Sequence, residues 1–135
     1  MTCPKDLNMK DSFVVAKEIV RVLIEKQGID VRLYDVRESC AITDFYVNVT
    51  GRSVSHVGSL SDDVQEKLAE LGANATRVEG RRASNWVLLD YSDVIVNVLD
   101  KQSRDFYSLD RHFGEDALVD ISDVIQEVDE KFLIK

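Results

Sequence analysis

The chain has 135 residues, of which 44% are hydrophobic and 31% charged, and its formal net charge is −8. This length fits one compact domain, and the composition is that of an ordinary globular protein. The acidic balance argues against DNA, other free nucleic acid or an anionic membrane as the main partner, because phosphate binding needs clustered Lys and Arg side chains. It favours a basic partner, such as a basic protein.

Cys3 and Cys40 are the only cysteines, and they form no C-x-x-C motif. We therefore expect a reduced, cytoplasmic protein. The N-terminal residues show neither an apolar signal stretch nor an Arg-rich transit peptide, and no apolar run approaches the ~18 residues that span a bilayer.

Apolar residues at helical spacing predict two amphipathic helices in the first half of the chain. The first covers residues 12–27, with Asp11 or Ser12 as its cap and Gly28 as its left-handed end. The second follows a junction near residue 53 and stops at Gly72. Its apolar stripe is Val57, Leu60, Val64, Leu68 and Leu71.

Alternating or continuous apolar runs predict strands over residues 31–36, 45–50, 75–79, 86–90 and 93–99. The last two form a hairpin and are so apolar that we expect cover on both faces of the sheet. Residues 45–79 indicate a parallel strand–helix–strand crossover. The order of elements predicts an α/β or α+β fold, in which helices flank a mixed five-stranded sheet.

The C-terminal part of the chain predicts two further helices. Asp100 caps the first, and Gly114 ends it. Its apolar stripe is Phe106, Leu109 and Phe113. We therefore divide the chain into a single domain, residues 1–118, and an acidic amphipathic tail, residues 119–135, which either docks on the domain or frays, or else packs on a partner chain. The apolar stripe of the tail is Ile121, Val124, Ile125, Val128 and Phe132.

A strand-to-helix junction at Thr50-Gly51-Arg52-Ser53 is a candidate anion site, because the start of a helix offers free N–H groups. The alternative is a turn glycine followed by Ser53 as an N-cap. No nucleotide fingerprint accompanies the junction.

Two carboxylates flank the predicted hairpin turn. Asp90 and Asp93 are either paired metal ligands or turn residues whose side chains accept backbone N–H groups. His56 and His112 lack the spacing of metal ligands, and no catalytic constellation is present. We expect no metal and no cofactor.

Two aromatic residues of the hairpin are candidate interface residues. Trp86, the only tryptophan, begins a strand directly after a polar loop, and it belongs either to the core or to an interface. Tyr91, in the turn, is harder to bury. Trp, Tyr and Arg are the residues that most often anchor protein interfaces, so the sequence predicts a binding surface here.

Five motifs follow one another within residues 12–118. They read TDFYV (43–47), TGRSVSHV (50–57), VEG (78–80), WVLLDYSDVIV (86–96) and RDFYSL (104–109). In this order they resemble the ribosomal silencing factor family, also called the Iojap family. The resemblance implies a nucleotidyltransferase-like fold without the catalytic acids. It also implies binding to the large ribosomal subunit through its L-fourteen protein, a steric block of association with the small subunit, and a homodimer when free.

The partner-binding residues that the resemblance implies are Glu79, Gly80, Trp86, Asp90, Tyr91 and Asp93. Three positions depart from the family pattern. Ser92 replaces a frequent glycine and is expected to alter the turn, whereas Asn97 replaces a histidine and His112-Phe113 a Leu-Trp pair, which we interpret as repacking.

The resemblance therefore implies a non-enzymatic translation repressor. A transferase of this fold needs an Asp-x-Asp pair on the strand after the junction, and residues 75–79 contain none. Two alternatives stay open: a nucleotide-binding or nucleotidyltransferase-type enzyme that uses the Gly51–Ser53 junction, and a dimeric scaffold that self-associates through the hairpin.

Overall fold

The structure is a computed structural model that describes residues 11–39, 42–80 and 84–133. Its strands are β1 (Ile29–Asp35), β2 (Phe45–Gly51), β3 (Arg77–Glu79), β4 (Trp86–Asp90), β5 (Val94–Asp100) and β6 (Leu118–Val119). Its α-helices are α2 (Ser12–Glu25), α3 (Val54–Glu70), α4 (Lys101–Tyr107) and α5 (Ser122–Leu133), and two 3-10 helices are η1 (Leu109–His112) and η2 (Glu115–Ala117).

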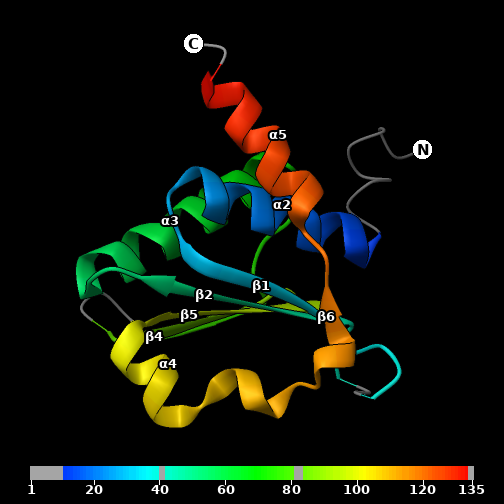
Figure 1. Ribbon diagram of the computed structural model, residues 1–135, viewed down its shortest axis with the longest axis vertical. Helices are drawn as coiled ribbons and strands as arrows, with labels where there is room; N and C mark the ends of the chain where they lie inside the picture. The colour runs from blue at the N-terminus through cyan, green and yellow to red at the C-terminus, as the bar shows by residue number, and fades with distance from the viewer. Residues whose placement is uncertain (1–10, 40–41, 81–83, 134–135) are drawn as a thin grey trace.

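One mixed sheet in the order β3-β4-β5-β2-β1-β6 forms the centre of the molecule. Helices α2 and α3 cover one face, α5 lies on α2, and α4 covers the other face (Figure 1). The mixed α+β fold is confirmed, but the described chain has six strands where the sequence predicted five, because the two-residue β6 is too short to leave a periodic pattern.

The parallel pair β2–β5 lies in the interior of the sheet. All residues from Val94 to Leu99 of β5 are buried, so the predicted cover on both faces is confirmed for this strand. In β4 only Val87 and Leu89 are buried. The opposite face of β4 is therefore the less covered part of the hairpin.

The crossover through α3 connects β2 to β3, which runs parallel to β2 but lies at the edge of the sheet beyond β5 and β4. Ser53 is the N-cap of α3, as predicted, and its hydroxyl accepts the His56 N–H. Gly72, which follows the helix, has a φ of 94°. Local capping rules thus located both ends of this helix.

Helix α2 begins as predicted but ends differently. Asp11 is the N-cap, and its carboxylate accepts the Phe13 N–H at 2.9 Å. The prediction that Gly28 takes the left-handed conformation is wrong, because Gln27 takes it with a φ of 67°. The position of Gly28 requires a residue without a side chain for another reason, because a Cβ atom there would lie 2.6 Å from Cγ2 of Val49.

Helix α4 is shorter than the sequence predicted. It begins at the Asp100 cap, but Ser108 takes a left-handed φ of 49° and the chain continues into η1. The predicted stripe is therefore divided, with Phe106 78% exposed and Leu109 buried. Gly114 ends no α-helix.

The acidic tail packs on the domain, which was the first of the two interpretations. Ile121, Val124 and Val128 belong to the hydrophobic core, and α5 lies against α2 (Figure 1). Two ion pairs join α2 to α5: Lys17–Asp123 at 2.5 Å and Arg21–Glu127 at 2.9 Å. The side chain of Phe132 lies outside the described residues.

None of the helices in the described part of the chain is both long enough and apolar enough to cross a membrane.

Candidate functional site

The six predicted partner-binding residues lie in two groups at opposite ends of β4. Trp86 begins the strand and Asp90 ends it, and a rise of about 3.4 Å per residue separates them by roughly 14 Å. Glu79 and Gly80 lie near the Trp86 end, and Tyr91 and Asp93 are in the turn. The structure therefore does not bring these residues into one site.

A pocket of about 360 Å³ opens at the Trp86 end of β4, and Glu79, Gly80, Trp86 and Leu88 line it. Gly80 has a φ of 91°, and a Cβ atom there would lie 2.4 Å from the Trp86 carbonyl oxygen. Gly80 is thus needed for the close approach of β3 and β4. Leu88 was missed by the sequence reasoning, although the alternation of β4 places its side chain on the same face as Trp86.

Aromatic side chains of α4 lie next to Trp86, which lines this pocket. The Tyr107 ring lies 5.1 Å from the Trp86 ring, and the Phe106 ring lies 4.9 Å from that of Tyr107. Phe106 is 78% exposed and Tyr107 52%. We call Trp86, Phe106 and Tyr107 the aromatic cluster. The sequence reasoning assigned Phe106 to a core stripe, but adjacent residues of a helix point about 100° apart, which indicates that one of the two aromatic side chains faces outward.

The indole of Trp86 is held by a chain of hydrogen bonds beneath α4. Its Nε1–H donates to Oδ1 of Asn97 at 3.0 Å, and Nδ2 of Asn97 donates to Oδ1 of Asn48 at 3.1 Å. Nδ2 of Asn48 then donates to Oδ1 of Asp110 at 3.2 Å. Asn48 and Asn97 are buried neighbours on β2 and β5. Their matching positions in two apolar strands were the signal that could have revealed this network.

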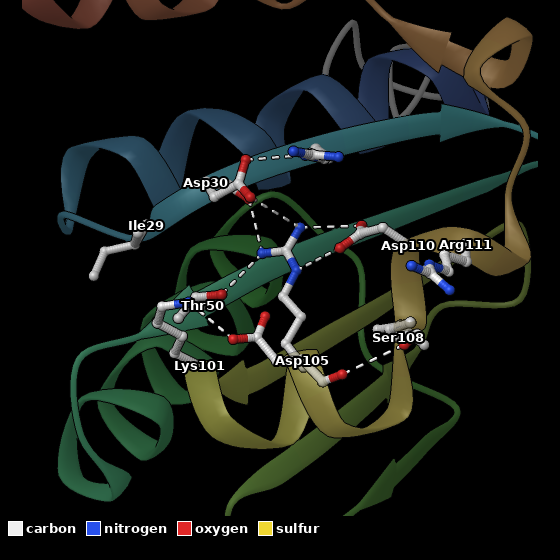
Figure 2. A pocket seen from close by; sticks show the side chains of 11 residues that line it. Ile29, Asp30, Thr50, Lys101, Asp105, Ser108, Asp110 and Arg111 are labelled. Carbon is white, nitrogen blue, oxygen red and sulfur yellow. Dashed lines mark hydrogen bonds and ion pairs between the residues drawn. The ribbon is translucent and has the colours of Figure 1, made fainter.

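Asp110 and Arg104 form the far end of the network. Nε of Arg104 donates to Oδ2 of Asp110 at 2.7 Å, and Nη1 donates to Oγ1 of Thr50 and to the carbonyl oxygen of Asp30, both at 2.9 Å. Arg104 lines a pocket of about 410 Å³ together with Asp30, Thr50 and Asp110. Figure 2 labels these last three side chains. Arg104 is only 5% exposed, so its charge is compensated inside the protein.

The environment of Asp110 favours its charged form. Burial alone would raise the pKa of this carboxyl, but hydrogen bonds from Arg104, Asn48 and Tyr34 outweigh it and hold the pKa below its usual range. Asp110 is therefore a carboxylate at neutral pH and only accepts hydrogen bonds.

The junction at Gly51–Ser53 uses its polar groups within the chain. The Arg52 N–H donates to Nδ1 of His56 at 2.9 Å, and the Ser53 hydroxyl accepts the His56 N–H at 3.2 Å. Nε2 of His56 lies 3.1 Å from the carbonyl oxygen of Lys26. This geometry corresponds to the capping interpretation of the junction.

The hairpin turn uses Asp90 as a turn residue. Oδ1 of Asp90 accepts the Ser92 N–H at 2.8 Å, and the Asp93 carbonyl oxygen accepts the N–H groups of Asp44 and Phe45. Within residues 11–39, 42–80 and 84–133, no three His, Cys, Asp or Glu side chains gather as metal ligands. Cys3 and Cys40 lie outside these ranges.

Comparison with known proteins identifies the family. A family model described as ribosomal silencing factor during starvation, RsfS, matches residues 9–132. The chain belongs to this family. The ribosomal silencing factor RsfS of Chromobacterium violaceum is 30% identical over 100 residues, which are 74% of this chain and 82% of that protein. The protein of the same name from Halalkalibacterium halodurans is 28% identical over 106 residues, 78% of this chain and 91% of that one.

Solved structures agree with the RsfS fold of the chain. The crystal structure of a Chromobacterium violaceum protein matches with a TM-score of 0.74 and 29% identity, over 77% of this chain and 87% of that one. A Bacillus halodurans structure matches with a TM-score of 0.67 and 25% identity, over 76% and 92%.

Two of the three departures from the RsfS pattern lie in the β4–β5 hairpin. Ser92 takes a φ of 71°, so it adopts the left-handed conformation that glycine favours. Asn97 accepts the indole N–H of Trp86 and donates to Asn48, so it is more than a packing substitute.

The side chain of Tyr91, in the β4–β5 turn, is not fully exposed. Its side chain is half-buried against the hydrophobic core, and burial raises the pKa of its hydroxyl to about 12. That hydroxyl is buried and has no hydrogen-bond partner among the described residues. Tyr91 was expected to be harder to bury than Trp86, but both side chains are half-buried.

Proposed function

We propose that this member of the ribosomal silencing factor family is a non-enzymatic, cytoplasmic translation repressor. It binds the large ribosomal subunit through its L-fourteen protein and blocks association with the small subunit, especially in starvation. Family membership supports the ribosomal role, because the matching proteins are named ribosomal silencing factors. As the resemblance implies, the free protein is a homodimer.

The aromatic cluster is the observation that carries the proposal. Large rigid rings that are partly exposed beside a pocket are typical anchors of protein interfaces. The ring of Trp86 is partly exposed, and its N–H is hydrogen-bonded inside the protein. A partner can therefore cover the apolar surface of the ring without leaving the N–H unpaired. Glu79 is exposed at the same pocket, and the net charge of −8 favours a basic partner.

The turn residues Asp90, Tyr91 and Asp93 contribute to binding in different ways under this proposal. Asp93 is exposed and available to basic groups of the partner, whereas Asp90 also holds the turn. Tyr91 acts through the core beneath the turn. We therefore expect the strongest contributions to come from the Trp86 end of β4.

The enzyme alternative has little structural support. Its basis was the free N–H groups of the Gly51–Ser53 junction, and the N–H groups of Arg52 and His56 are bonded within the chain. β3 carries Arg77, Val78 and Glu79, without the Asp-x-Asp pair that would hold Mg²⁺ for phosphoryl transfer. A role in binding needs neither feature.

Cosedimentation of purified protein with the isolated large subunit tests the proposal. Trp86→Ala and Phe106→Ala should each weaken binding, and loss of an anchor worth about 2 kcal/mol corresponds to about 30-fold in the dissociation constant. Ile125→Ala is the matched control, because Ile125 is another exposed apolar side chain but lies on α5. Thermal melts check that each variant folds. If all three variants bind as wild type does, the aromatic cluster is not the interface.

A further inference from the structure

The hydrogen-bond chain that ends at Trp86 has a single direction. Each of its two amides accepts on the side of Trp86 and donates on the side of Asp110. An asparagine amide has one accepting and one donating end, so reversing either one would place two donors or two acceptors face to face. The orientation of Asn97 and Asn48 is therefore a property of the whole chain.

Both ends of this hydrogen-bond chain are fixed, because the indole N–H of Trp86 can only donate and the carboxylate of Asp110 can only accept. The Asp110 carboxylate accepts from Arg104 through Nε at 2.7 Å and Nη2 at 3.1 Å, and from the Tyr34 hydroxyl at 3.0 Å. Because a carboxylate offers no donor, Asn48 has to turn its NH2 group toward it. The carbonyl of Asn48 then faces the NH2 group of Asn97, and the carbonyl of Asn97 is left to accept the indole N–H.

We propose that Asp110 is a positioning residue for Trp86, acting through Asn48 and Asn97. Asp110 lies on η1 and does not contact Trp86 in this network, but its carboxylate is the acceptor-only end that holds both amides in the direction that the indole N–H needs. The proposal rests on the proposed function in one respect: it expects the fixed ring of Trp86 to be the surface that the large subunit binds.

Replacing the carboxylate by an amide removes the acceptor-only group at one end of the chain, while the indole N–H at the other end still needs an acceptor. In Asp110→Asn, the side chain at position 110 can present its NH2 group to Asn48, and the chain can then reverse. A reversed Asn97 would face the indole N–H with its own NH2 group, which is a contact between two donors. The ring would have to move, so its position would differ between molecules.

The single tryptophan makes the direct test simple. In uniformly ¹⁵N-labelled protein the indole N–H of Trp86 gives one resonance. We expect Asp110→Asn and Asn97→Leu to shift it and to speed its exchange with solvent by at least about tenfold. Asp105→Asn is the matched control, because it makes the same chemical change at an exposed carboxylate that pairs with Lys101 and takes no part in the hydrogen-bond chain to Trp86, and it should leave the resonance unchanged.

Asn97→His is the matched rescue. A neutral histidine ring has one accepting nitrogen and one N–H, so it can accept from Trp86 and donate to Asn48 in the same direction. We expect it to keep the slow exchange that Asn97→Leu loses. If Asn97→His and Asn97→Leu behave alike, the direction of the chain is irrelevant and the proposal fails.

Affinity for the isolated large subunit is the second readout. Asp110→Asn and Asn97→Leu should weaken binding by at least about tenfold, and Asp105→Asn should not. An unchanged resonance in Asp110→Asn, or a shifted resonance with unchanged affinity, overturns the positioning role. If Asp110→Asn fails to fold, Asn48→Leu decides, because it separates Asp110 from Asn97 and should shift the Trp86 resonance in the same way; an unchanged resonance in that variant overturns the role. If wild-type protein itself does not bind the large subunit, the proposed function fails, and the resonance alone still decides whether Asp110 sets Trp86.

Discussion

Ser92 keeps the β4–β5 turn in a conformation that a residue with a side chain seldom adopts, with a φ of 71°. A residue other than glycine in the left-handed conformation costs roughly 1–2 kcal/mol. A glycine there avoids this strain, but it has more conformational freedom in the unfolded chain, which offsets part of the stabilisation. We therefore expect Ser92→Gly to raise the free energy of unfolding by roughly 0.5–1 kcal/mol. Denaturant unfolding measures the change, and a loss of stability would show that the Ser92 side chain makes a favourable contact that outweighs the strain.

Tyr91 makes the stability of the protein sensitive to alkaline pH. Its hydroxyl ionises near pH 12 in the folded protein, against about 10 for an exposed tyrosine. Because the folded pKa is the higher one, the contribution of Tyr91 is fully present below pH 10 and is lost as the pH rises toward 12. Tyr91→Phe should therefore lose less stability than wild type between pH 10 and pH 12. At neutral pH it should be as stable, or about 1 kcal/mol more stable, because it removes a buried hydroxyl that has no partner in the described chain.

Denaturant unfolding at a series of pH values measures both effects of Tyr91→Phe. If wild type and variant lose the same free energy of unfolding between pH 10 and pH 12, the Tyr91 hydroxyl reaches water in the folded protein.

Single residues were predictable from sequence where a local hydrogen bond decides their place. The caps Asp11, Ser53 and Asp100 follow from the preference of short polar side chains for helix starts. The burial of Tyr91 and the network below Trp86 were not predictable, because both depend on elements that lie far apart in sequence and meet only in the fold.

At the scale of elements, strong periodicity was enough to predict long segments. β2, β5 and α3 were predicted within one or two residues at most ends, because each has an apolar pattern bounded by turn or cap residues. β6 was missed, since two residues carry no period. The predicted extent of α4 was wrong. Ser108 takes a left-handed conformation that the sequence did not predict, and it ends the helix before the next apolar residue of the predicted stripe.

Helix α5 is expected to stabilise the domain through its apolar side chains rather than its charges. Val124 is fully buried, so Val124→Ala should lower the free energy of unfolding by about 2 kcal/mol. Ile125 is 42% exposed on the same helix, and Ile125→Ala should cost less than about 0.5 kcal/mol. Asp123→Asn, which breaks an exposed ion pair with Lys17, should cost less than about 1 kcal/mol.

Urea unfolding of these three α5 variants compares the contributions. Equal effects of Val124→Ala and Ile125→Ala would contradict docking of α5 on α2 and would bring forward its other interpretation, packing on a partner chain.

At the scale of the whole molecule, composition predicted the kind of partner and the motifs predicted the family. The family match over residues 9–132 confirms the resemblance. The candidate site was only partly predictable: Trp86, Glu79 and Gly80 do meet at one pocket, but the turn residues lie at the other end of β4. The sequence did not predict the part of the site formed by Leu88, Phe106 and Tyr107. The exposure of these side chains depends on where α4 ends over the face of the sheet.

The most direct test of the account is the joining of separated ribosomal subunits in the presence of the protein, followed on sucrose gradients. With excess wild-type protein, we expect the protein to migrate with the large subunit and the whole-ribosome peak to fall, whereas Trp86→Ala should restore that peak and Ile125→Ala should not. An undiminished whole-ribosome peak, with wild-type protein bound to the large subunit, would contradict the claim that binding blocks association of the two subunits.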